Sequence, residues 1–110
     1  MSVSRSISEA DWKVFRQLRE VALERFCERV LSEVGRVTSD PDKTAHERYL
    51  AVFRLVERRD RELADAFNDA RRSTAWWQLA RIQSHGLLTE DEMGRFSPET
   101  REAVQLLTGR

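Results

Sequence analysis

The sequence predicts an all-α fold in one domain spanning residues 1–110. Gly occurs four times and Pro twice, and no segment alternates apolar and polar residues with the period of two that marks a strand. Apolar residues recur every three or four positions instead, which is the period of a helix that buries one face. The length of 110 residues also fits a single domain.

The first long helix is predicted over residues 9–34, after a flexible arm at residues 1–7. Ser8 is a favourable N-cap, and Asp11 supplies the acidic residue of a capping box. Gly35 stands where a C-terminal glycine ends a helix. This helix would be long enough to form one side of a hairpin.

The second long helix is predicted over residues 41–72. Asp40 followed by Pro41 is typical of an N-cap and a first helical residue. A break between Arg59 and Arg61 stays open as an alternative, because that segment is entirely charged. The short connection before this helix favours an antiparallel pair of long helices.

Two or three short helices are predicted after the long pair. Each begins at a favourable cap, and glycine ends the first two. Their approximate bounds are residues 75–85, capped by Ser73 or Thr74; residues 90–94, with the Thr89–Glu92 capping box; and residues 98–107, after Ser97 and Pro98.

The charge balance and the apolar runs exclude several classes of protein. The chain has 19 basic and 19 acidic residues and no formal net charge, which removes the usual footprint of a protein that binds anionic membranes or nucleic acids. No apolar run reaches the roughly 18 residues of a membrane span, and the N-terminus lacks the apolar stretch of a secretory signal. Cys27 is the single cysteine. We therefore expect a cytoplasmic protein.

A nucleic-acid interface is the third choice among the functions considered. Four arginines would align along one flank of the second helix, but acidic residues share that flank, so we expect salt bridges there more than phosphate contacts. The arginines are Arg54, Arg58, Arg61 and Arg72, and the acids are Glu47, Asp65 and Asp69.

The first long helix carries two apolar faces. The set in its first half includes Phe15 and Leu18, whereas the set in its second half, which includes Phe26 and Val30, is rotated by roughly 120°. Trp12 lies with the second set. Either short helices cover the two ends within one monomer, or part of one face is the seam of a homodimer.

The second long helix has one apolar stripe with a charged interruption. Asp60 falls at the centre of that stripe if the helix is continuous. A buried carboxylate needs partners such as an arginine or a tryptophan N–H. The alternatives are a helix break, a structural ion pair and a functional polar pocket, and Arg59 would contribute to that pocket.

Two tryptophans and a histidine complete the candidate residues. Trp76 belongs to the apolar stripe of its helix, but Trp77 lies about 100° away, at the margin or outside. An exposed Trp77 would be an interface anchor, and the alternative is that it closes the edge of the core.

His46 and Glu47 begin like the zinc-protease motif HExxH, but Leu50 stands where the second histidine is required. We find no catalytic constellation and predict no metal or cofactor.

Two resemblances to known families can be stated from the residues. The runs SEADWKVFRQLREVALERFCERVL, RRSTAWWQLA and FSPETRE resemble a family of small bacterial all-helical proteins, which implies no activity. The segment from His85 to Met93 is similar to the centre of helical modules of the SHOCT type. That resemblance implies a corner between two helices linked to oligomerisation. The Lys-rich stretch of those modules is replaced here by the helix-breaking residues 94–98.

The sequence therefore favours a non-enzymatic helical protein that interacts with other proteins, as a homodimer or scaffold. The alternative is a regulatory protein that binds a small ligand in a polar pocket. Asp60, Arg59, His46 and the tryptophans would line that pocket.

Overall fold

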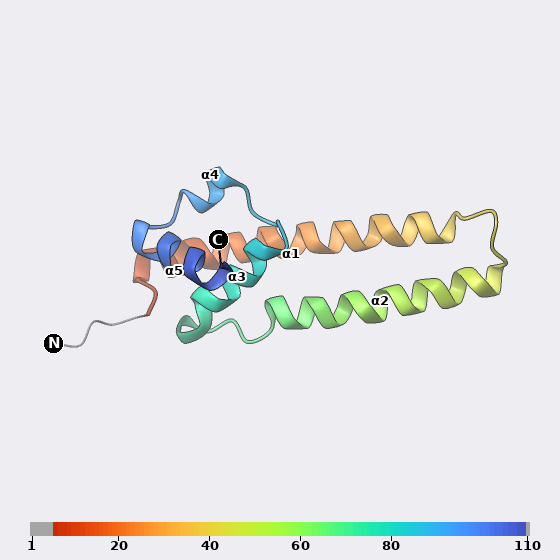
Figure 1. Ribbon diagram of the computed structural model, residues 1–110, viewed down its shortest axis with the longest axis horizontal. Coiled ribbons are helices and arrows are strands. Elements are labelled where there is room, and N and C mark those ends of the chain that lie inside the picture. Colours follow the sequence, from red (N-terminus) through yellow and green to blue (C-terminus); the bar gives the residue numbers. More distant parts are fainter. Residues whose placement is uncertain (1–5, 110) are drawn as a thin grey trace.

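The computed structural model describes residues 6–109, and this part of the chain is helical without any strand. The all-α fold class is therefore confirmed. The elements are α1 (Glu9–Thr38), α2 (Ala45–Phe67), the 3-10 turn η1 (Arg72–Thr74), α3 (Ala75–Ser84), α4 (Glu90–Met93) and α5 (Pro98–Thr108). Figure 1 shows α1 and α2 as a long antiparallel hairpin, with α3, α4 and α5 gathered at the end away from its connection.

The hydrophobic core lies at that end, which we call the base of the hairpin. Phe15, Leu18 and Ala22 of α1 are buried there together with Phe67 at the end of α2. Residues of α3, α5 and their connections complete the core: Ala75, Leu79, Ala80, Ile82, Leu87, Leu88, Phe96 and Val104. Helices α3 and α5, together with the connections between them, thus cover the base of the hairpin.

The first long helix does not end at Gly35, as the sequence predicted, but continues to Thr38. Glycine within an exposed helix costs only about 1 kcal/mol, and the helix continues past it. The hydroxyls of Thr38 and Ser39 donate to the carbonyl oxygen of Gly35, at 3.0 and 2.8 Å. The helix end is therefore three residues later than the glycine signal indicated.

Both predicted ends of the second helix were wrong. It begins after Thr44, whose capping box with Glu47 (3.1 and 2.9 Å) provides the stronger start signal. Asp40 instead accepts a hydrogen bond from the backbone N–H of Asp42 at 3.0 Å, so this segment forms a turn. At the other end, Asn68 leaves the helical conformation, and the helix stops five residues before Arg72. The helix is continuous through Arg59–Arg61, so the break considered there does not occur.

The predicted arm and caps have mixed outcomes. Residues 1–5 of the arm lie outside the described residues, and Ile7 is buried in the core instead of belonging to a flexible segment. Thr74 precedes α3 but does not cap it through its side chain. Ser8, Thr89 and Ser97 accept the expected cap hydrogen bonds.

The two apolar faces of α1 serve different neighbours. The first face, which includes Phe15 and Leu18, is covered by the base of the molecule. The second face includes Phe26, whose ring contacts Phe67 edge-on at 6.1 Å between centroids. Farther along it, Val30, Val34 and Val37 are half-buried, and the neighbouring Leu31 is 68% exposed. The short helices therefore cover the first apolar face within the monomer. They do not cover the part of the second face that lies toward the connection between α1 and α2.

Candidate interaction surface

The half of the hairpin nearest the connection extends beyond α3, α4 and α5 (Figure 1). We call this half the tip. The apolar stripe of α2 does not point at α1 here. Leu55 is buried, Arg59 binds α1 through Glu33, and Arg48 donates to the carbonyl oxygen of Thr38 at 2.8 Å. These three residues therefore mark the side of α2 that meets α1.

One side of the tip is apolar and exposed, and we call it the hairpin face. Tyr49, Phe53 and Val56 of α2 are 67%, 57% and 45% exposed. An open groove of about 260 Å³ separates α2 from α1 on this face, lined by Phe26, Cys27, Val30, Leu31, Val34, Val56, Arg59, Asp60 and Leu63. A second hollow continues toward the connection, lined by Thr38, Ala45, Arg48, Tyr49 and Val52. Apolar side chains from two helices thus form one continuous surface.

The opposite side of the tip is charged. Its shallow hollow is lined by Glu33, Arg36, Val37, Ala51, Arg54, Leu55 and Arg58. The two sides of one hairpin therefore differ in chemistry, one being apolar and the other charged.

Arg59 and Asp60 are neighbours with different surroundings. Arg59 donates to Glu33 at 2.9 Å and to Glu62 at 2.6 Å. These hydrogen bonds raise the pKa of Arg59, and the bond from Arg59 lowers the pKa of Glu33. Asp60 is exposed, so the prediction of a buried carboxylate at this position was wrong. The stripe that surrounds it faces outward, and no further helix among residues 6–109 covers it.

The buried carboxylate of the fold is Asp11, which sequence reasoning treated only as a capping residue. It is 4% exposed. Ser97 donates to it from its backbone N–H at 3.0 Å and from its hydroxyl at 2.5 Å, and Thr100 donates at 2.6 Å. Burial raises the pKa of Asp11, but the hydrogen bonds from Ser97 and Thr100 outweigh it and lower that pKa overall. The indole of Trp76 donates to Thr100 at 3.0 Å and extends the network. Ser97 and Thr100 thus fix the start of α5 on α1, and Trp76 ties α3 to α5. These contacts give the network a structural role.

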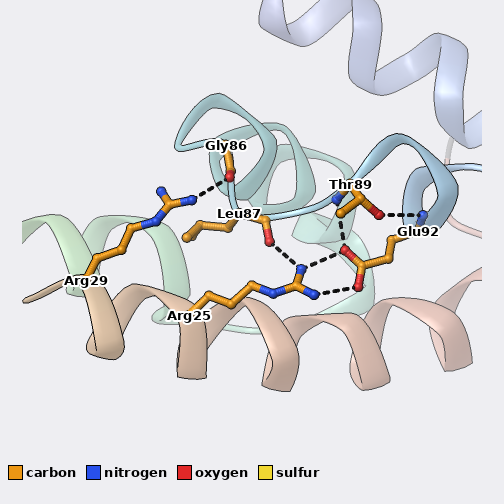
Figure 2. Close-up of polar contacts among 6 residues, drawn as sticks. All are labelled: Arg25, Arg29, Gly86, Leu87, Thr89 and Glu92. Carbon is orange, nitrogen blue, oxygen red and sulfur yellow. Dashed lines mark hydrogen bonds and ion pairs between the residues drawn. The ribbon is translucent and has the colours of Figure 1, made fainter. Parts of the chain in front are cut away.

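Figure 2 shows a second polar cluster, which fixes the corner between α3 and α4 on α1. Arg25 binds both carboxylate oxygens of Glu92, at 2.6 and 2.9 Å, and donates to the carbonyl oxygen of Leu87 at 2.9 Å. Arg29 donates to the carbonyl oxygens of His85 and Gly86, both at 2.8 Å. Two hydrogen bonds lower the pKa of Glu92 to about 2. The larger effect comes from Arg25 and the smaller one from the backbone N–H of Thr89. We call these contacts the corner latch.

The predicted site residues do not form one pocket. His46 and Asp60 are fourteen positions apart on a continuous helix, which separates them by about 21 Å. Trp12 is partly buried, stacks on Phe15 at 5.5 Å and lines a separate groove with Arg16. Trp76 and Trp77 line a third hollow beside α5. Trp77 is 57% exposed, as predicted for a residue off the stripe.

Side chains that could hold a metal ion are not brought together within residues 6–109. No group of three or more His, Cys, Asp or Glu side chains in this range could hold a metal ion. The arginines considered for nucleic acids are partly neutralised: Arg61 pairs with Glu57 at 3.1 Å and Arg72 with Glu9 at 3.1 Å. None of the helices in this range combines the length and apolar character that crossing a membrane requires. The hairpin face is therefore the strongest candidate surface.

Comparisons with known proteins identify no relative of this chain. No protein-family model, curated protein or solved structure matches the chain. The two resemblances stated from the sequence stay predictions. The function must therefore be argued from the surface itself.

Proposed function

We propose that this protein is a non-enzymatic helical interaction protein that forms a homodimer through the hairpin face. The observation that carries the proposal is the exposed apolar surface shared by α1 and α2, with Leu31, Tyr49 and Phe53 each more than half exposed. A contiguous exposed apolar patch on a soluble protein is often a functional interaction site. Two antiparallel hairpins packed face to face bury such surfaces as a four-helix bundle.

The size of the hairpin face supports a second copy as the occupant. The free part of α2 between His46 and Leu63 is about 27 Å long, and two packed helices are about 20 Å wide. Each copy would cover about 500 Å², so a dimer would bury about 1,000 Å², the lower limit for a specific interface. The zero net charge of the chain also means that two copies do not repel each other.

A small-ligand site receives less support from the same surface. The groove beside Asp60 is open and measures about 260 Å³, below the roughly 300 Å³ at which ligand pockets begin. Asp60 and His46 are too far apart to bind one small molecule. The polar pocket expected from the sequence is therefore the weaker of the two functions.

Sedimentation equilibrium of the full chain tests the proposal. We expect a concentration-dependent equilibrium between the 12.9 kDa chain and a species of twice that mass. Phe53→Glu should abolish the dimer, because it places a charge in the centre of the apolar surface. Arg54→Gln lowers the net charge by the same amount on the charged side and should leave the dimer intact. A strictly 12.9 kDa species at high micromolar concentration would overturn the proposal.

A further inference from the structure

The exposed stripe of α2 has the spacing of a coiled-coil seam. Successive members are three and four positions apart in strict alternation, which is the pattern that packs one helix along another. The members are His46, Tyr49, Phe53, Val56, Asp60, Leu63 and Phe67. Phe67 is 2% exposed and belongs to the core of its own chain. Leu63 is partly buried against that core but also lines the open groove. The part of the seam that can meet a partner, which we call the free seam, therefore runs from His46 to Leu63.

The polar groups of the free seam are arranged about its midpoint. The midpoint falls between Phe53 and Val56, both strongly exposed. Tyr49 precedes the pair by four positions, and Asp60 follows it by four. His46 lies one helical turn beyond Tyr49, at the start of α2. A carboxylate at one end of the seam is thus matched by a phenol and an imidazole at the other.

Within its own chain, Asp60 has no cation available from the residues that line the groove. Arg59 is already bound to Glu33 and Glu62. The lining residues from α1 are apolar except for Cys27, and on α2 the nearby Arg61 pairs with Glu57. A partner that covers Asp60 must therefore bring a donor, because an unpaired carboxylate is costly to bury.

We propose that two copies pair their α2 seams antiparallel, so that Tyr49 of each copy donates a hydrogen bond to Asp60 of the other. This inference rests on the proposed homodimer and names its alignment. The two-fold axis passes between Phe53 and Val56, which pack on the same pair of the second copy. His46 then lies beside the Tyr49–Asp60 contact, where a ring N–H can donate to the carboxylate.

The parallel alignment is disfavoured by the same residues. It would place Asp60 of one copy against Asp60 of the other inside a covered seam, where two like charges repel strongly. The antiparallel alignment separates the two carboxylates and gives each a donor. A polar residue in an apolar seam commonly fixes register in this way, at some cost in affinity.

Distance measurement between two spin labels tests the alignment. Asp42 is exposed in the connection and lies outside the seam, so Asp42→Cys labels the tip. The Cys27→Ser background removes the second thiol, which lines the groove, so its own sedimentation must match that of the wild type. In the antiparallel dimer the two labels should be about 35 Å or more apart, given 1.5 Å per helical residue. A distance of about 20 Å or less would place the tips together and overturn the alignment.

A double-mutant cycle on the dissociation constant tests the contact itself. Tyr49→Phe and Asp60→Asn should each weaken the dimer about threefold to tenfold, and the double variant should weaken it little more than either single one. Glu57→Gln, which lies off the seam, should combine additively with Tyr49→Phe. Additive effects of Tyr49→Phe and Asp60→Asn, or tighter association of Asp60→Asn, would overturn the contact.

The two failures can be told apart. A wild-type chain that stays monomeric in the same sedimentation runs contradicts the homodimer and the alignment together. A dimer with a short tip-to-tip distance contradicts only the alignment and leaves the hairpin face as the interface.

Discussion

The base and the tip of the hairpin place residues of one type in opposite environments. Phe67 at the base is 2% exposed, whereas Phe53, two heptads earlier on the same stripe of α2, is 57% exposed. The difference does not come from α2, which is a continuous helix. It comes from the C-terminal helices, which cover the hairpin only at its base (Figure 1). The apolar stripe of an amphipathic helix therefore shows where a core could form. How much of that stripe is buried depends on the other helices of the chain.

The largest expected effect comes from replacing two phenylalanines of this stripe, one at the base and one at the tip, by alanine. Phe67→Ala should lower the free energy of unfolding by about 3–5 kcal/mol, because it leaves a cavity beside Phe26. Phe53→Ala should lower it by less than about 0.5 kcal/mol in the monomer. Urea denaturation at low protein concentration measures both. Equal losses from the two variants would mean that the tip is packed as tightly as the base.

The corner latch makes the base sensitive to acid, with a smaller expected effect. The pKa of Glu92 is lowered from 4.5 to about 2, so its contribution is complete above pH 4.5 and is lost as the pH falls toward 2. Glu92→Gln should cost about 1–2 kcal/mol at neutral pH, because it removes a charge-assisted pair. Between pH 4.5 and pH 2, the unfolding free energy of Glu92→Gln should therefore fall less than that of the wild type.

A control for this prediction lies on the other side of the molecule. Glu57 also accepts from an arginine, Arg61, but both side chains are at least half exposed. Glu57→Gln should leave the acid profile of unfolding close to that of the wild type. Loss of the acid sensitivity in Glu57→Gln, or its persistence in Glu92→Gln, would contradict the role given to the latch.

The fold could be predicted from the sequence wherever a single residue pattern marks the start or the end of a helix. Ser97 and Pro98 begin α5 and Gly86 follows α3, as their residue types indicate. The connection between the long helices was misplaced because two start signals lie close together. The reciprocal bonds between Thr44 and Glu47 satisfy two backbone donors, so they begin the helix, and the earlier Asp40 forms a turn instead.

The candidate site could be predicted only in part, because a periodic pattern does not state what covers a face. The sequence placed Asp60 on the apolar stripe, where the structure also has it, but burial of that stripe was assumed. Asp11 was missed for the opposite reason. Its donors, Ser97 and Thr100, are more than 85 positions away, and no local pattern connects them.

The smallest expected effect is that of Trp77→Ala at the base, which is best measured beside its neighbour Trp76. Trp76 is tied to Thr100 by its indole N–H, so Trp76→Ala should destabilise the fold by about 3 kcal/mol or more. Trp77 is 57% exposed, and Trp77→Ala should change the unfolding free energy by less than about 0.5 kcal/mol.

The same Trp77→Ala variant separates the base from the tip as an interface. Because the hollow lined by Trp77 and Leu106 lies beside α5, away from the tip, its loss should leave the sedimentation of the proposed dimer unchanged. A dissociation constant that rises tenfold in Trp77→Ala would move the interface to the base. In that case the exposed seam of α2 would be left without the occupant proposed for it, and Trp77 would regain the anchor role that its position off the stripe suggested.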